Sequence, residues 1–189
     1  PVYRRKTGAG FAGVLSYYKQ GGGEADLNNV SAPQLKFSGF DGTAVYFSGF
    51  ADWVVGSTTN LRTFLSLRNL ERSGTGTYPP DTTSRTVNLK QTGLSVGATL
   101  KLYSNPNGIS WWGGGFEVVK ASKNDVTSSN ISASYKDEPF IFFANASLGY
   151  DINIYKNIYI LPEFRLGVGI NGDPLIINAE VLIPIGFSF

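Results

Sequence analysis

The sequence predicts an all-β protein in which eight antiparallel strands, joined in chain order, close into an up-and-down barrel. Glycine (23 residues) and aromatic residues are abundant and charged residues make up only 16% of the chain, which favours strands and turns over helices. Apolar and other residues alternate over long stretches, most regularly in Leu175–Phe189, and a period of two predicts strands. The connections suit hairpins and leave no room for helical crossovers.

The first strand is predicted at residues 6–18, where Phe11, Leu15 and Tyr17 share one face. Within it, Gly8–Gly13 has the spacing of a dinucleotide-binding loop. That motif needs a preceding apolar strand and a following helix, and a charged segment and a Gly-rich loop flank it here instead. We therefore interpret these glycines as small residues on a crowded strand face.

The next three strands are predicted at Val45–Val55, Leu61–Arg72 and Gly93–Leu102, because apolar residues alternate with smaller or polar ones in each. Leu35–Gly42 is expected to extend the second strand beyond a membrane. Each of these strands has one predominantly apolar face.

The last four strands are predicted at Trp112–Val119, Phe140–Ile152, Ile158–Ile170 and Leu175–Phe189. Short turns connect strands at 56–60, 104–110, 155–157 and 171–174, and long polar loops at 19–34, 73–85 and 120–138. The long loops are the first, third and fifth of the seven connections, so they all fall at one end of the barrel.

The apolar face is predicted to point outward into lipid. The interior of an eight-stranded barrel holds on the order of a dozen side chains, whereas the last five strands alone offer about thirty positions on their apolar faces. Those faces carry no charged residue, as expected where a lipid-facing Lys or Arg costs about 2–4 kcal/mol. No apolar run is long enough for a transmembrane helix, so any spanning segments are strands.

An aromatic girdle is predicted at the periplasmic rim, on the assumption that both chain ends lie on that side. Its members lie near the strand ends on that side: Trp53, Tyr103, Trp111, Trp112, Tyr150, Tyr155, Tyr159 and Phe189. The three long loops are then extracellular.

The opposite faces predict an interior charge network made of Asp52, Arg62, Arg68, Lys101, Glu117, Asp151, Glu163, Arg165 and Glu180. Charges in a narrow barrel must be paired, because isolated burial is costly. The turn at 171–174 sets a register that places Arg165 opposite Glu180. The network is interpreted as a rigid plug, with a polar path for ions or a gate as the alternative.

The same register places Pro162 opposite Ile183 and Pro184 opposite Leu161. Each proline removes a donor from the strand pairing. A β-bulge or a local distortion of the strand is the expected explanation, and a lateral opening for a small apolar ligand is the alternative.

The whole chain resembles the small eight-stranded bacterial outer-membrane barrels of the OmpA transmembrane-domain and OmpX type, through its architecture and its apolar closing strand ending at Phe189. No family-specific motif matches, so no functional residue is carried over. The resemblance implies a location in the bacterial outer membrane, reached by export with removal of a signal peptide. It also implies contact with outer-membrane lipid and lipopolysaccharide.

The expected function is a non-enzymatic structural or surface-interaction role of one domain, residues 1–189, acting through extracellular loops that contact a surface partner. A narrow channel for ions or small solutes is the alternative, together with the lateral conduit. The chain has no Cys, His or Met, which argues against disulfides, thiolate metal sites and His-dependent catalysis, so no cofactor or metal is expected. A formal charge of +2 does not support a nucleic-acid partner.

Overall fold

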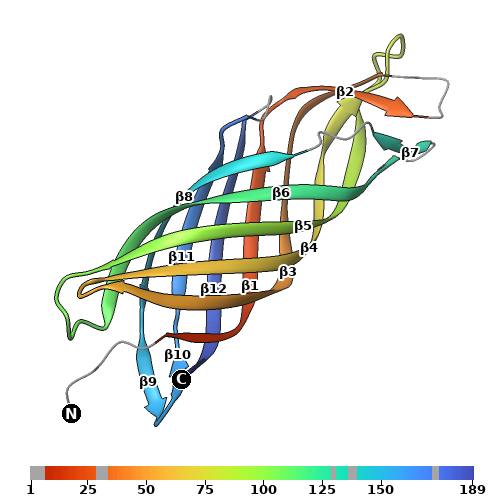
Figure 1. Ribbon diagram of the computed structural model, residues 1–189. Helices are drawn as coiled ribbons and strands as arrows, with labels where there is room; N and C mark the ends of the chain where they lie inside the picture. Colours follow the sequence, from red (N-terminus) through yellow and green to blue (C-terminus); the bar gives the residue numbers. More distant parts are fainter. Residues whose placement is uncertain (1–6, 29–33, 129–130, 136–139, 172–174) are drawn as a thin grey trace.

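The computed structural model describes residues 7–28, 34–128, 131–135, 140–171 and 175–189. These residues form twelve strands in one antiparallel sheet (Figure 1). Within them, no helix has the length and apolar character needed to cross a membrane. The predicted all-β antiparallel class is therefore confirmed, while the structure divides into twelve strands where the sequence predicted eight.

Eight of the strands form a continuous series of neighbours. They are β1 (Gly8–Gln20), β3 (Gln34–Gly56), β4 (Thr59–Thr77), β5 (Arg85–Tyr103), β6 (Ser110–Ser128), β8 (Ile141–Tyr150), β11 (Glu163–Gly169) and β12 (Ile176–Ser188). Each pairs with the next in this order, and β12 pairs with β1. The series thus returns to its starting strand.

Two short strands continue this series toward the end of the molecule where the C-terminus lies. They are β9 (Ile152–Tyr155), which follows β8, and β10 (Ile158–Ile160), which precedes β11 (Figure 1). Pro162 separates β10 from β11 because it has no N–H to donate. The pairing register with β12 is the same on both sides of this break, and the Leu161 N–H donates to Pro184 O at 2.9 Å. Of the two expected forms, a bulge or a local distortion, the structure shows the second, because the strand is interrupted at Pro162 while its register with β12 contains no bulge.

The strands extend well into the segments predicted as long loops. β4 continues to Thr77 and β6 to Ser128, while β2 (Gly23–Asn28) and β7 (Ile131–Tyr135) are further strands within them. Pairing of β2 with both β3 and β7, and of β7 with β6, joins the extended strands at the end opposite the C-terminus (Figure 1). The remaining parts of those loops, 29–33, 129–130 and 136–139, lie outside the described residues, as does 172–174 of the last turn.

The alternation was misread in these segments because its polarity inverts along the strand. In the lower part of β5 the apolar Leu94 and Val96 are exposed and Ser95 is buried. Nearer the beginning of the same strand, Val87 and Leu89 are buried and Lys90 is exposed. Inverted polarity is expected where the outside of a strand passes from hydrocarbon to water. We call this end of β2, β3, β4, β5, β6 and β7, which includes the buried Val87 and Leu89 of β5, the extension.

The extension has a hydrophobic core of its own, formed by Leu27, Leu35, Phe37, Phe40, Tyr78, Val87, Leu89 and Val126. Phe37 and Phe40 both point inward although they are three positions apart, because the β3–β4 register shifts between them. Gly39 sits in this shift with φ of 145°, a conformation that glycine adopts readily. The two phenyl rings then pack with centroids 4.7 Å apart.

Candidate functional site

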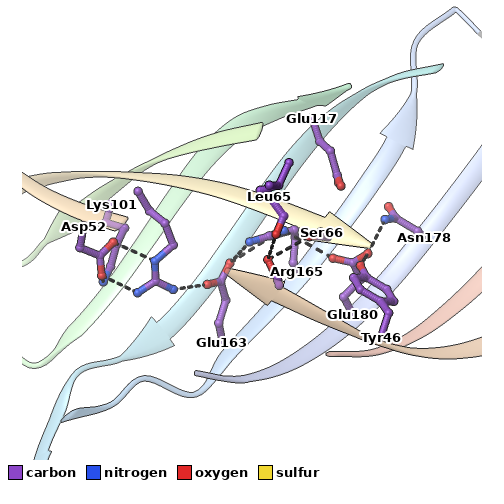
Figure 2. A network of polar contacts seen from close by, with 12 residues as sticks. Tyr46, Asp52, Leu65, Ser66, Lys101, Glu117, Glu163, Arg165, Asn178 and Glu180 are labelled. Carbon is purple, nitrogen blue, oxygen red and sulfur yellow. Dashed lines mark hydrogen bonds and ion pairs between the residues drawn. The ribbon is translucent and has the colours of Figure 1, made fainter. Parts of the chain in front are cut away.

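The buried charged residues inside the closed strand series are the candidate site. All nine residues of the predicted charge network are less than a tenth exposed. They project toward a common interior, since successive residues of a strand alternate between its two faces. Figure 2 labels six of them: Asp52, Lys101, Glu117, Glu163, Arg165 and Glu180. The structure therefore brings together side chains separated by more than a hundred residues in the chain.

Arg62 on β4 is the centre of the half of the network nearer the C-terminus. Its Nε and Nη2 donate to the two carboxylate oxygens of Asp52 at 2.8 and 2.6 Å, and its Nη1 donates to Glu163 Oε2 at 2.7 Å. The guanidinium also lies over the Phe50 ring at 4.6 Å. The bidentate pair with Asp52 and the bond to Glu163 satisfy most of the guanidinium donors in a buried site.

Lys101 and Asp151 form the end of the network closest to the short turns. Lys101 Nζ donates to both Asp151 oxygens at 3.0 and 3.2 Å and lies 3.5 Å from Asp52 Oδ2. The Tyr103 hydroxyl and the Trp111 indole N–H also donate to Asp151, at 2.5 and 2.9 Å. Asp151 thus accepts from one charged and two neutral donors, which compensates the burial of its charge.

Arg165 on β11 links the two halves. It donates to Glu163 Oε1 from Nε and Nη2 at 3.2 and 2.9 Å. Its Nη1 lies 3.5 Å from Glu180 Oε2, a distance that supports an ion pair without a hydrogen bond. Arg165 and Glu180 are directly opposite in the β11–β12 pairing, as the hairpin register predicted.

Glu180 and Arg68 continue the network toward the extension. Arg68 Nη2 is paired with Glu117 and donates to Glu180 Oε1 at 3.2 Å. Glu180 Oε1 also accepts from the Tyr46 hydroxyl at 2.5 Å and from Asn178 Nδ2 at 3.1 Å (Figure 2). Contacts therefore connect all nine predicted residues without a gap.

Sequence reasoning missed a tyrosine partner of the network and a neighbouring buried arginine with its two glutamine partners. Tyr18 contacts Arg68, and Arg72 Nη1 donates to Gln20 Oε1 at 2.5 Å while its Nη2 donates to Gln91 Oε1 at 3.2 Å. The prediction counted charges within the assumed membrane strands, so it passed over tyrosines and over Arg72 at a strand end. Tyr18 shares its strand face with Ser16, and this alternation was the available signal.

The predicted aromatic girdle divides into two groups. Trp53, Trp112, Tyr150, Tyr155 and Phe189 are exposed, whereas Tyr103, Trp111 and Tyr159 are buried. The prediction is wrong for those three, which point into the interior. Trp111 and Trp112 are consecutive in β6, so they must face opposite sides. Tyr103 is opposite Trp111 in the β5–β6 pairing, and both bind Asp151.

This division predicts the fluorescence of the three tryptophans in lipid vesicles. Variants that retain one tryptophan each, with Phe at the other two positions, should differ in quenching by brominated phospholipids. Trp53 and Trp112 should be quenched strongly and Trp111 weakly, because Trp111 is 4% exposed and Trp112 is 63% exposed. Equal quenching of Trp111 and Trp112 would contradict the inward orientation of Trp111.

The arrangement pairs opposite charges from different strands and so holds those strands together. Five basic residues, including Arg72, face five buried carboxylates inside the strand series. No group of three or more His, Cys, Asp or Glu among the described residues is placed to hold a metal ion. Two cavities adjoin the network, of about 30 Å³ beside Asp52 and Asn60 and about 20 Å³ beside Arg68 and Arg72. Each has room for about one or two water molecules.

No protein-family model and no curated protein sequence matches the chain. Among solved structures, the outer-membrane protein OprG from Pseudomonas aeruginosa is similar over 100% of this chain and 99% of its own, with a TM-score of 0.50 and 13% identity. Ail, the attachment invasion locus protein of Yersinia pestis, is similar over 95% of this chain and 99% of its own, with a TM-score of 0.48 and 12% identity. The closed series of antiparallel strands and the OprG likeness show that the chain has the fold of outer-membrane β-barrel proteins.

Proposed function

We propose that the protein is an integral bacterial outer-membrane barrel whose closed wall consists of eight strands, β1, β3, β4, β5, β6, β8–β9, β10–β11 and β12. In this proposal the wall is one domain, the interior network seals it, and the extension projects from the cell surface. The role is structural or surface-interacting, without catalysis. The observation that carries the proposal is the distribution of polarity, with charged residues inside and large apolar residues outside.

The outward side chains support a lipid environment. Phe11, Phe47, Leu67 and Phe116 are 69–75% exposed, and they belong to four different strands around the wall. An apolar surface that encircles a chain in this way exceeds the patches found on soluble monomers. In hydrocarbon it stabilises insertion, and the exposed Trp53 and Trp112 suit the interface with the headgroups.

The ion-pair network supports a sealed interior, and so a structural role over the channel alternative. Arg62, Lys101, Glu117 and Glu180 are all at most 2% exposed, and they come from four strands that surround the interior. An ion would have to displace at least one of these charge pairs to pass. The hydrogen bond from the Leu161 N–H to the Pro184 carbonyl oxygen joins the strands at this level, which argues against a lateral conduit between β10 and β12.

Conductance in planar bilayers tests this proposal. The native protein should give no steady single-channel steps, because the paired charges occlude the interior. The double variant Arg62→Ala/Arg68→Ala removes two side chains that cross the interior, and it should show brief openings if it inserts. Steady steps from the native protein would favour the channel. A protein that stays monodisperse without detergent and shows no heat-dependent shift on a gel would contradict the membrane barrel itself.

The extension supports a surface role. Its outer face holds a groove of about 590 Å³ whose polar lining includes Asp41, Glu71, Lys90, Asp125 and Thr127. Lys90 Nζ lies 2.7 Å from Glu71 Oε1, and the hydrogen bond with Glu71 raises the pKa of Lys90. Such a face is compatible with the sugars and phosphates of lipopolysaccharide or with a surface partner.

A further inference from the structure

The outward apolar stretch differs in length between the two sides of the wall. On β4 it covers Leu61–Leu67, on β5 Leu94–Leu102 and on β6 Trp112–Val118. On β8–β9 it covers Phe142–Ile154, and along β12 with the residue on either side of that strand it covers Leu175–Phe189. At about 3.3 Å per residue and a strand tilt of about 40°, each residue adds about 2.5 Å of height. The apolar height is therefore about 15 Å at β4 and β6, about 20 Å at β5, and about 30–35 Å at β8–β9 and β12.

The pairing register gives the relative heights of residues on opposite sides. An outward row follows the pairs from Thr63 through Ala98, Phe116, Ala144, Val168, Ile177, Lys19 and Asp41 to Ser73. It returns to β4 ten residues nearer the extension than it began. A row perpendicular to the strands thus climbs toward the extension, by about 3 Å for each strand crossed.

This climb allows the heights of residues at the extension end of β5 and of β11 to be compared. Val96 pairs with Val118, Val118 pairs with Phe142, and the Ile170 N–H donates to Phe142 O at 2.8 Å. Three strand crossings raise Ile170 by about 9 Å above Val96, and four residues along β5 raise Thr92 by about 10 Å. Thr92 and Ile170 are therefore at the same height on different sides.

At that height the two sides differ in chemistry. Ile170 is 62% exposed and belongs to the apolar band. On the β4–β6 side the polarity has already inverted, and the exposed residues there are Asn69, Thr92 and Lys120. At the opposite end of the band, near the C-terminus, a polar residue again lies at the height of an apolar one. The polar residue is Ser104, after the end of β5, and the apolar one is the exposed Ile152 on β9. Leu102 pairs with Trp112 and Trp112 with Leu148, which puts Ser104 and Ile152 within about 1 Å in height.

We propose that the outward face of β4, β5 and β6 is a thinning surface, which draws the two membrane boundaries together and favours lipids with shorter or more disordered chains. A typical barrel band is about 25 Å tall. A bilayer matched to the band of about 30–35 Å on β8–β9 and β12 would put Asn69, Thr92 and Lys120 in hydrocarbon, at a cost that local thinning relieves. Tilting the barrel does not relieve this cost, because tilt raises the apolar band on one side and lowers it on the other without changing the height of either. The proposal rests on the outer-membrane location proposed above.

Spin labels at matched heights test the thinning surface. The chain has no Cys, so Thr92→Cys, Ile170→Cys, Ser104→Cys and Ile152→Cys each give a single labelling site. The ratio of collision with a water-soluble nickel complex to collision with oxygen would be measured in vesicles of phosphatidylcholine with 18-carbon chains. The labels at 92 and 104 should both lie nearer water than their partners at 170 and 152, by about 5 Å at each boundary.

Each other outcome overturns the proposal in a distinct way. Equal depths within both pairs mean a flat bilayer. Opposite differences at the upper and lower pairs mean tilt. Labels at 92 and 104 that neither oxygen nor nickel reaches mean a protein partner or a second copy on this face. Four labels that never contact lipid mean that the membrane location itself is wrong.

A second measurement does not depend on labelling. Asn69→Leu, Thr92→Leu and Lys120→Leu together lengthen the apolar band of β4–β6. The native protein should have a higher urea-unfolding midpoint in lipid with 14-carbon chains than in lipid with 18-carbon chains. The triple variant should have similar midpoints in the two lipids. The matched control is Ser73→Leu, Asn88→Leu and Thr127→Leu on the outer face of the extension, which should keep the higher midpoint in 14-carbon lipid. An unchanged difference between the two midpoints in the first variant contradicts the proposal.

Discussion

Arg62→Met is expected to lower the free energy of unfolding by about 3–5 kcal/mol, because it leaves buried Asp52 without its main counter-ion and buried Glu163 without one of its two. Arg62 is 2% exposed and donates to both Asp52 and Glu163. Methionine fills much of the same volume, so the loss reports on charge pairing more than on packing. The measurement is urea unfolding in lipid vesicles, followed by the heat-dependent shift of the folded band on a gel.

Lys90→Met is the matched control for this substitution. Its ion pair with Glu71 has similar length, 2.7 Å, but both side chains are more than half exposed. Exposed pairs contribute about 0–1 kcal/mol, so this variant should unfold close to the native midpoint. Adding Asp52→Asn and Glu163→Gln to Arg62→Met should recover part of the loss. Equal effects of Arg62→Met and Lys90→Met would show that the interior network does not stabilise the wall.

Gly115→Ala is expected to destabilise the protein by about 1–3 kcal/mol through forced separation of two strands. Gly115 faces the interior, and a Cβ built there would lie 2.0 Å from the backbone oxygen of Ala98 on β5. The obstruction is backbone, so no side-chain rotation relieves it. The strands approach this closely because a small closed barrel bends its sheet sharply, and inward-facing side chains are crowded on the concave side.

Gly114→Ala tests this explanation at the adjacent position of β6. Gly114 faces outward, and the nearest atom to a Cβ there is 3.6 Å away, an ordinary contact. Removing a glycine from a strand stabilises it by about 0.5–1 kcal/mol where space allows, so this variant should be neutral or slightly more stable. Similar losses from both substitutions would mean that β6 rejects any side chain, irrespective of the face.

The buried network and the thinning surface act together. Inside, charge pairs tie β3, β4, β5, β11 and β12 together, so the wall resists deformation. Outside, the wall has unequal apolar heights around its circumference. A stiff wall transmits that inequality to the bilayer, because deforming lipid costs less than breaking a buried ion pair.

Much of this architecture follows from local pattern. Alternation in Leu175–Phe189 and its neighbours identified antiparallel strands, since side-chain direction in a strand depends only on position parity. The hairpin before β12 placed Arg165 opposite Glu180, and the pairing agrees. The nine charged residues of the network could be selected because they are the ionic groups on the faces opposite the apolar ones.

Other features required the tertiary structure. Tyr103, Trp111 and Tyr159 share strand parity with the buried Lys101, Glu117 and Glu163, so alternation alone already places these three aromatic residues inside. What only the tertiary structure decides is that Tyr103 and Trp111 both donate to Asp151. The extension was missed because its alternation has the opposite meaning once water replaces lipid outside. Composition and alternation therefore determine that the chain forms amphipathic strands. Register and closure decide which charges meet and how much hydrocarbon each side of the wall covers, because both depend on contacts between residues far apart in the chain.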